Sequence, residues 1–367
     1  MPHGLYGLAL LLIAATLLPF WRSPRWWIRV WDFPRVQLSL AICACGIGLW
    51  VTANPHTAAK AVATAGLAAA AAIHLAHIWR YTPLASVQVP RANPETPRAR
   101  RLRILFANVL ASNRRADALI ALIADADPDL VLLVETDGWW DRELGLLAPR
   151  FRHVLRHPLA NTYGMHLLSM LPLRNQGFRF LVEPDVPSAF AEVQLGSGDW
   201  IAFFGVHPRP PRPAQDTDER DAELLIVGHE AREGRLPAIV SGDLNDVAWS
   251  YTTRLFQRIS GLLDPRIGRG LYSTFHAQIP LLRWPLDHLF HDARFTLVEL
   301  RRLPAFGSDH FPVLVELAFE PERAHEIHVP APAPGDRMFS ARAILRAFPR
   351  GARHLRERLG RRRRRRH

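Results

Sequence analysis

Hydrophobic residues are concentrated in three long stretches near the start of the chain, at positions 5–20, 36–53 and 61–79. A helix needs about 20 predominantly apolar residues, within a range of roughly 17–25, to cross the hydrocarbon core of a bilayer. Trp26, Trp27 and Trp31 lie between the first two stretches, where interfacial aromatic residues are expected. The pattern predicts a membrane region over residues 1–81 with about three transmembrane helices. The alternative is a signal peptide followed by buried core helices, but no small-residue cleavage site stands out.

The loops that flank these stretches differ in their arginine content. Four arginines lie between the first and second stretches and five lie within residues 80–101, whereas the loop between the second and third stretches has only Lys60. Loops rich in Lys and Arg favour the cytoplasmic side of a membrane. With three spans, the first loop and the remainder of the chain share one side. The count therefore predicts a multi-pass membrane protein whose soluble domain is cytoplasmic.

Two segments lack regular apolar spacing. Residues 82–100 contain four prolines and predict an exposed, semi-extended linker. Residues 321–367 contain a second Pro-rich stretch and end in six consecutive arginines, 361–366, followed by a histidine. They predict a basic, largely disordered tail, which is either simply solvated or attracted to anionic lipid headgroups. Nucleic acid is a weaker candidate partner for this tail, since no aromatic residues interleave the arginines to stack on bases.

The net charge of +12 is unevenly distributed. Residues 1–100 carry +7 and residues 321–367 carry +10, while residues 101–320 carry −5. Proteins that grip long duplex nucleic acid are more often basic over the domain that binds it. The acidic middle of the chain therefore counts against duplex DNA as its ligand.

Residues 101–320 contain many short apolar runs that are typical of strands, with amphipathic segments between some of them. The first run ends at Asn108, a helical pattern follows up to Pro128, and a fully apolar run then ends at Glu135. A second helix is expected around residues 219–230. Further strands are expected at 166–171, 188–195, 200–207, 237–245, 287–291 and 312–319. The pattern predicts an α/β domain in which two packed, mainly antiparallel β-sheets are flanked by helices in four layers, α/β/β/α.

Several short motifs occur in order along this domain: ILFANV, PDLVLLVE, YGMHLLSMLPL, FFGVHPRPP, VSGDLN, PLDHLF and GSDHFPV. An Asp or Asn after an apolar strand is more often a turn former than a catalytic residue, so each motif alone is weak. Together, and in this order, they resemble the endonuclease/exonuclease/phosphatase superfamily, and within it bacterial members with N-terminal membrane helices. Two departures from the resemblance, Met170 and Phe275, affect the expected substrate pocket.

The resemblance implies a divalent-metal site, with Mg²⁺ or Mn²⁺ as the cofactor, and a role for each polar residue of the motifs. Oxygen ligands of the kind that Mg²⁺ prefers come from Glu135, with Asn108 and Asp309 completing or bordering the shell. Asp243 resembles the carboxylate that deprotonates water. The remaining residues resemble those that contact the phosphate or orient such a residue: His207, Asn245, Asp287 and His310.

These features favour a membrane-anchored, metal-dependent phosphoester hydrolase. It would be a phosphodiesterase or phosphatase that acts on a lipid headgroup or a small phosphorylated metabolite. One alternative is a Mg²⁺-dependent nuclease that uses the basic tail for affinity. An alternative of another class is a non-catalytic membrane-bound module that binds a phosphorylated partner, which predicts the loss of main catalytic residues, and none of them is missing.

Overall fold

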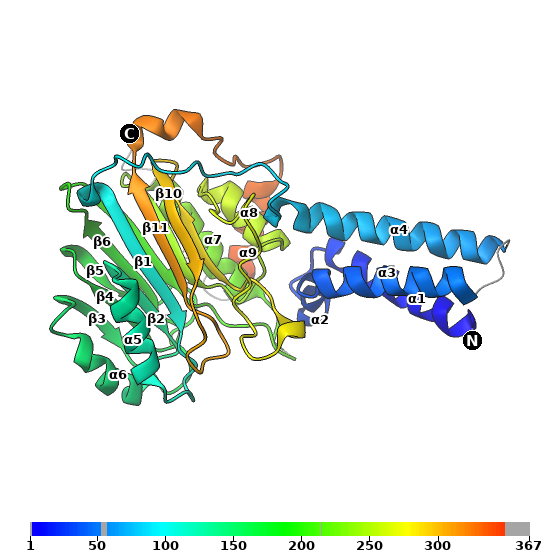
Figure 1. Ribbon diagram of the computed structural model, residues 1–367, viewed down its shortest axis with the longest axis horizontal. Coiled ribbons are helices and arrows are strands. Elements are labelled where there is room, and N and C mark those ends of the chain that lie inside the picture. Colours follow the sequence, from blue (N-terminus) through cyan, green and yellow to red (C-terminus); the bar gives the residue numbers. More distant parts are fainter. Residues whose placement is uncertain (1, 53–56, 214, 349–367) are drawn as a thin grey trace.

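The structure is a computed structural model that describes residues 2–52, 57–213 and 215–348. Three helices, α1 (Pro2–Leu17), α3 (Arg35–Thr52) and α4 (Ala58–Ile78), pack side by side and project from one end of a larger domain (Figure 1). We call these three helices the stalk. The short helix α2 (Trp26–Arg29) lies where the stalk meets the domain.

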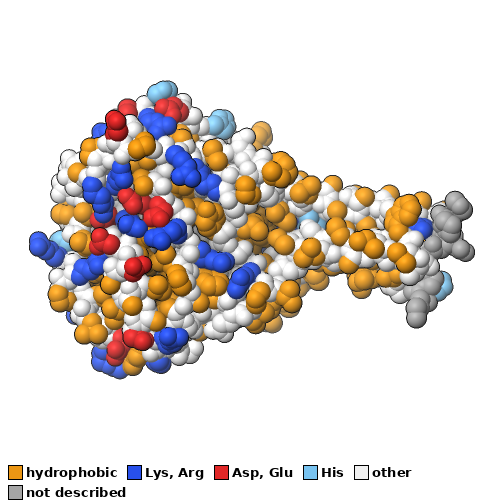
Figure 2. All heavy atoms as spheres, viewed as in Figure 1, with side chains coloured by type: hydrophobic (Ala, Val, Ile, Leu, Met, Phe, Trp, Pro, Cys, Tyr) orange, Lys and Arg blue, Asp and Glu red, His pale blue; other side chains and the backbone are white. Residues whose placement is uncertain are grey.

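The stalk has the dimensions and the surface of a membrane-spanning bundle. Three segments, His3–Phe20, Arg35–Thr52 and Ala58–Tyr81, are long and apolar enough to cross a membrane. Hydrophobic side chains cover the visible face of the stalk, whereas Lys, Arg, Asp and Glu gather over the domain (Figure 2). Inside the bundle, the buried Thr16 Oγ1 lies 2.9 Å from His74 Nε2, so this histidine has a polar partner away from lipid.

The first sheet of the domain has six strands in the order β10-β11-β1-β2-β4-β3. Only β1 and β2 run parallel, and every other neighbouring pair is antiparallel. Its strands in chain order are β1 (Arg101–Asn108), β2 (Leu130–Val134), β3 (His153–His157), β4 (Met165–Ser169), β10 (Phe295–Arg302) and β11 (Val313–Phe319).

The second sheet has five strands in the order β5-β6-β7-β8-β9, and its only parallel pair is β7 with β8. Its strands are β5 (Leu173–Arg179), β6 (Ser188–Gln194), β7 (Trp200–Val206), β8 (Ala238–Asp243) and β9 (Asp287–His291). The helices of the domain are α5 (Ala116–Ala126), α6 (Gly138–Leu144), α7 (Asp218–Glu233), α8 (Tyr251–Ser260) and α9 (Asp336–Ala347).

Three hydrophobic clusters hold the layers together. Between the sheets, alternate residues of the strands interdigitate, such as Ile104 and Phe106 of β1 with Phe203 of β7. The opposite face of β1 and β2 packs on α5 and α6, and the outer face of the second sheet packs on α7 and α8. The predicted α/β/β/α sandwich with mainly antiparallel sheets, preceded by three apolar helices, is confirmed.

The predicted strands and the helix near residues 219–230 are present, but β3, β5 and β10 were not predicted. All three are edge strands, and an edge strand needs no apolar surface on both faces. β5 illustrates this, because no residue of its sequence LRNQGFR is buried. Helix α8 was missed as well, although Ser250 caps its first turn by accepting a hydrogen bond from Thr253 N and Gly261 ends it in a left-handed conformation.

Residues 82–100, predicted as an exposed linker, are exposed at most positions, and two buried side chains anchor the segment to the domain. Val89 is fully buried in the core between the sheets, and the backbone on either side of it bonds to Ile267 and Leu297. The buried Thr96 donates to the Glu320 carboxylate. The prolines suit this path, because an extended strap at the margin of a sheet leaves many backbone N–H groups without a partner.

The expectation of a largely disordered tail is wrong for the part of 321–367 that the structure describes. Helix α9 packs against α7 and α8, and its residues Ala343 and Ile344 are buried against Leu225, Leu255 and Ile259. The apolar positions of α9 repeat at helical spacing, so the segment has a face to bury. The six arginines at 361–366 lie outside the described residues.

Candidate active site

Polar residues gather where the strands of the two sheets end. Asn108 is the last residue of β1, and Glu135 directly follows its parallel neighbour β2. Asp243 is the last residue of β8, and His207 directly follows its parallel neighbour β7. Parallel neighbours present their carboxyl ends at one edge of a sheet, so each pair shares an edge, and hydrogen bonds of Asn108 connect the two pairs.

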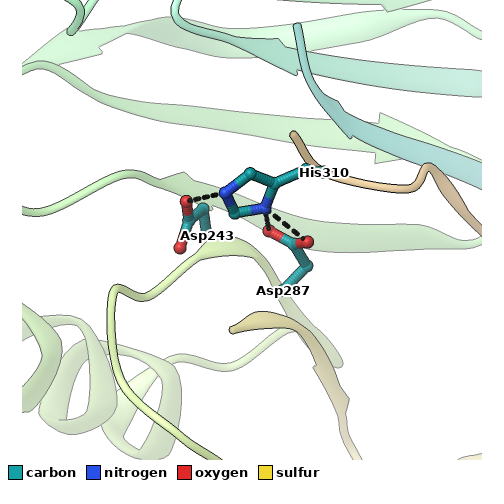
Figure 3. A group of neighbouring side chains, drawn as sticks. All are labelled: Asp243, Asp287 and His310. Atoms are coloured by element: carbon teal, nitrogen blue, oxygen red, sulfur yellow. Dashed lines mark hydrogen bonds and ion pairs between the residues drawn. The ribbon is translucent and has the colours of Figure 1, made fainter. Parts of the chain in front are cut away.

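Asp243, Asp287 and His310 form the buried centre of the site (Figure 3). Asp243 and Asp287 are direct partners in the antiparallel register of β8 and β9. The imidazole of His310 lies between them, with Nδ1 2.9 Å from Asp287 Oδ2 and Nε2 3.6 Å from Asp243 Oδ2. The first distance is a hydrogen bond and the second is an ion-pair distance. His310 therefore donates Nδ1–H to Asp287 and directs its other nitrogen toward Asp243.

The charges of this centre are mutually dependent. Burial lowers the pKa of His310, but Asp287 and Asp243 outweigh burial and raise it to about 10, so the imidazole is cationic at neutral pH. Burial raises the pKa of Asp243 to about 6, although the His310 cation opposes the rise. Thr274 Oγ1 accepts a hydrogen bond from Asp287 N and holds the start of β9 in place.

His207 faces Asp243 from another side. Its Nε2 lies 3.9 Å from Asp243 Oδ2, and burial lowers the pKa of His207, which favours the neutral imidazole. Its Nδ1 is buried and makes no hydrogen bond within the described part of the chain. Tyr163 packs against this ring with centroids 5.7 Å apart. The two histidines of the site thus present one cationic and one neutral ring to the same carboxylate.

Asn108 connects Glu135 with Asp243. Its amide nitrogen donates to Glu135 Oε1 at 2.8 Å and to Asp243 Oδ2 at 3.2 Å. Its amide oxygen accepts from Leu110 N, so this oxygen already has one protein partner. Burial raises the pKa of Glu135 despite the bond from Asn108, and the nearby charge of Asp309 adds to the rise. A bound cation would have the opposite effect, because it would stabilise the charged form of Glu135 and lower its pKa.

The residues present fit a hard divalent cation beside Glu135. Glu135 Oε2 accepts only a long 3.4 Å hydrogen bond from Ala111 N, which leaves carboxylate lone pairs for an ion. Asp243, Asp287 and His310 also lie close enough together to hold a metal. In that group, however, the cationic His310 already offsets one of the two aspartate charges and donates one ring nitrogen to Asp287, whereas the Glu135 carboxylate keeps free lone pairs.

Asn245 lies in a turn, whereas the strand predicted at 237–245 would have placed it on the same side as Asp243, so that prediction is wrong at its end. β8 ends at Asp243, and Asn245 has a φ of +50°, in the left-handed region. Its backbone N donates to Asp243 Oδ1, and its Nδ2 donates to Pro208 O at 3.0 Å. Glu135 has a φ of +64°, so two predicted site residues adopt a conformation that costs energy and is concentrated at functional sites.

Sequence reasoning did not assign four supporting residues. Arg220 donates to Asn245 O at 2.7 Å and thereby holds the turn. Ser308 donates to Asn108 O at 2.8 Å and accepts from His310 N. His288 bonds Asp246 O, and the ring of Phe275 lies 5.0 Å from that of His310. Ser308 lies within the motif GSDHFPV and His288 within PLDHLF, whereas no motif marks Arg220.

Comparison with known proteins decides which family this arrangement belongs to. The sequence model of the Endonuclease/Exonuclease/phosphatase family matches residues 78–310, which is more than half of the 367 residues. The chain belongs to the endonuclease/exonuclease/phosphatase family. Members of this family are in general hydrolases of phosphoester bonds and typically depend on a divalent metal. The match begins before residue 101 and includes the packed segment 82–100.

Solved structures of this family share the fold. D. rerio TDP2 complexed with single strand DNA product has a TM-score of 0.50 and 16% identity, over 59% of this chain and 98% of that one. The human Nocturnin catalytic domain with bound sulfate anion has a TM-score of 0.50 and 17% identity, over 61% of this chain and 96% of that one. At such identities the likeness extends to the fold alone. No curated protein matches the sequence.

Proposed function

We propose that this protein is a membrane-anchored, divalent-metal-dependent hydrolase of phosphoester bonds. The observation that carries the proposal is the convergence of strand ends from both sheets. This convergence surrounds the buried Asp243 with two imidazoles and connects it, through Asn108, to the carboxylate of Glu135. Phosphoester hydrolysis needs a base for water, positive charge for the phosphoryl oxygens and a rigid frame, and these residues supply all three.

Asp243 is the proposed base. Its pKa of about 6 leaves it ionised near neutral pH and still basic enough to accept a proton from an attacking water. Asn245 N holds Oδ1 at 2.9 Å, so the second oxygen, Oδ2, faces the histidines and accepts the proton. Asn245 Nδ2 has one hydrogen directed to Pro208 O and one that remains for a phosphoryl oxygen.

His310 and His207 are the proposed phosphate contacts. Both Nε2 atoms lie more than 3.5 Å from Asp243 Oδ2, and within the described residues neither makes a hydrogen bond. Each is therefore available to donate to a phosphoryl oxygen. Asp287 keeps the His310 imidazole oriented and protonated, which places a positive charge beside the phosphate. The neutral His207 donates without adding charge.

Glu135 is the proposed principal metal ligand, with Asn108 and Asp309 beside it. A divalent cation bound there, Mg²⁺ or Mn²⁺, would neutralise charge on the phosphoryl oxygens. The rise that burial produces in the pKa of Glu135 supports a site built for a bound cation. The apolar stalk supports membrane anchoring, and the arginine distribution supports a cytoplasmic domain. A lipid headgroup or a small phosphorylated metabolite is the proposed substrate.

The test is hydrolysis by the full-length chain in nanodiscs, with bis(p-nitrophenyl) phosphate and p-nitrophenyl phosphate as diester and monoester probes. We expect activity with Mg²⁺ or Mn²⁺ that EDTA abolishes and that Asp243→Asn and Glu135→Gln each reduce by at least ~100-fold. The matched control is Asp199→Asn, whose side chain accepts only from Ser197 Oγ on an exposed hairpin. Activity that survives Asp243→Asn would contradict the assignment of the base. A reporter enzyme fused after residue 320 tests the side of the membrane.

A second candidate activity is nucleic-acid hydrolysis. It gains support from the fold shared with D. rerio TDP2, which was solved in complex with a single strand DNA product. The net charge of −5 over residues 101–320 argues against it. A single-stranded oligonucleotide belongs in the substrate panel, and strong salt dependence that disappears on deletion of residues 361–366 would favour the nuclease.

A further inference from the structure

A cavity lies away from the candidate active site, where the stalk meets the domain. It has a volume of about 250 Å³ and opens between the segment that follows the first candidate span and helices α8 and α9. Four arginines and two aromatic residues dominate its lining: Arg22, Arg29, Tyr251, Phe339, Arg342 and Arg346. Both helices lie at the end of the domain from which the stalk projects (Figure 1). We call this space the junction cavity.

Two buried polar atoms of the junction cavity make no hydrogen bond within the described chain. One is Nε of Arg29, a residue only 3% exposed, and the other is the hydroxyl of Tyr251. The other end of Arg29 is fully engaged, since Nη2 donates to Thr252 and Asp246. Both residues line the cavity, but these two atoms have less than 1 Å² of accessible surface, so a ligand reaches them only after the side chains shift. The lining is polar in either case and suits a ligand that accepts hydrogen bonds.

The charge of the cavity indicates that this ligand is an anion. Within the described residues, Arg22 and Arg342 form no ion pair, and the Arg22 guanidinium lies 4.7 Å from the Tyr251 ring centroid and 5.2 Å from that of Phe339. Arg346 pairs with Asp218 at 2.8 Å. The one acidic lining residue, Asp221, is held by Arg220. Two guanidinium groups therefore remain uncompensated, and such groups match phosphate geometry.

The position of the cavity suggests where a phosphate would come from. Arg22 follows the candidate span His3–Phe20 almost directly. Between them, Trp21 is 62% exposed and stacks edge-to-face with the partly exposed Trp27 at 6.2 Å. Exposed tryptophans of this kind mark the headgroup level of a bilayer. The cavity is also smaller than the roughly 300–1,000 Å³ of sites that enclose drug-sized ligands, which suits a headgroup and excludes an acyl chain.

We propose that the junction cavity binds the phosphate group of an anionic phospholipid headgroup. Arg22 and Arg342, which line the cavity and form no ion pair within the described residues, donate hydrogen bonds to the lipid phosphate and offset its charge. The site is distinct from the active site and does not depend on the proposed hydrolysis, because none of its lining residues belongs to the catalytic set.

The experiment measures the melting temperature of the full-length protein in an uncharged detergent during titration with dioctanoyl phosphatidic acid. EDTA is present throughout to suppress metal-dependent binding at the active site. We expect a saturable rise in melting temperature that dioctanoyl phosphatidylcholine does not produce. In Arg342→Ala and in Arg22→Ala, binding of the phosphatidic acid should be weaker by roughly tenfold or more. The matched control is Arg337→Ala, an exposed arginine of the same helix α9 that does not line the cavity.

Each alternative result has a defined meaning. Inorganic phosphate that binds as tightly as the lipid, and is equally sensitive to Arg342→Ala, assigns the cavity to a free anion and overturns the lipid source. An equal loss in Arg337→Ala shows that surface charge alone attracts the lipid, which also overturns the proposal. Absence of saturable binding of the phosphatidic acid in the native protein overturns the proposal as well. Arg342 is exposed, so its variant is expected to match the native melting temperature without ligand.

Discussion

Replacing Asp287 by asparagine is expected to slow hydrolysis while the protein stays folded. Both carboxylate oxygens of Asp287 lie within 3.1 Å of His310 Nδ1, so the variant leaves a buried imidazole without its nearest counter-charge. Asparagine keeps the shape of the side chain and the backbone bond to Thr274. A hydrogen bond to a charged group contributes about 1.5–3 kcal/mol. If the transition state loses that stabilisation, the rate should be roughly 10- to 150-fold lower.

The assay is kcat and KM for bis(p-nitrophenyl) phosphate with saturating Mg²⁺, alongside the melting temperature of each protein. Asp292→Asn is the matched control, because Asp292 directly follows the same strand and pairs only with Arg294, 2.7 Å away at the partly exposed surface. We expect kcat of the control to stay within about twofold of native. If Asp287→Asn also stays within that range, His310 does not act as a charged contact and the reasoning fails.

Two further predictions concern stability. Gly242→Ala places a Cβ 1.8 Å from Val206 O, so chemical denaturation should show a free energy of unfolding lower by at least ~2 kcal/mol. The control is Gly177→Ala on β5, where the added Cβ meets open space and the free energy of unfolding should hardly change. Burial raises the pKa of Glu223 from 4.5 to about 8 although Ser188 donates to it, so the folded state retains a proton that the unfolded state loses. The free energy of unfolding should therefore fall by up to about 5 kcal/mol as pH rises from 4.5 to about 8, and level off above that. Glu223→Gln should remove this pH dependence, whereas the control Glu219→Gln on the same helix should keep it.

The sequence predicted the strands that are apolar on both faces and the helices with a regular apolar stripe. β1, β2, β7 and β8 are central strands, and their continuous apolar runs end at polar residues that turn out to be neighbours. Edge strands such as β3 and β5 carry their hydrogen bonds on one side and tolerate charged residues, so no local pattern marks them. Burial of Val89 and of helix α9 depends on tertiary contacts that a Pro-rich or basic composition conceals.

For the site, the sequence predicted which polar residues lie at the ends of strands, but not which of these residues lie next to one another. Asp243 and Asp287 are 44 positions apart and meet because β8 and β9 are antiparallel in one register, which periodicity cannot specify. Only the resemblance to a family related these two residues to His310. Asn245 shows the limit of local reasoning: counting two residues along a strand assumes that the strand continues, whereas β8 ends at Asp243 and Asn245 turns the chain with a positive φ.

The buried contact between stalk and domain has a consequence for catalysis. Arg29, from helix α2, donates to Asp246 at 3.4 Å and to Thr252 at 3.0 Å. Asp246 directly follows Asn245, whose carbonyl Arg220 holds, and Arg220 also lies 3.5 Å from Asp246. The segment between helices α1 and α3 thus contributes one of two cations that fix the turn beside the proposed base. Arg29 is therefore a positioning residue, because it acts through Asp246 and not on the substrate.

Arg29→Gln in the full-length chain is expected to lower kcat on the order of 10-fold and to leave KM for a small chromogenic diester unchanged. The reason is that displacement of a catalytic group by about 1 Å can cost up to ~100-fold. Arg29→Lys should recover part of the rate by keeping a cation near Asp246, and the exposed Arg25→Gln on the same connection is the control. Loss of the Asp246 pair should also lower the melting temperature, but Arg220 still neutralises that carboxylate, so the fold should survive. A lower melting temperature with an unchanged kcat would mean that Arg29 only fastens the stalk to the domain. A lower kcat that lysine restores would mean that helix α2, where the stalk meets the domain, holds the catalytic turn in its working geometry.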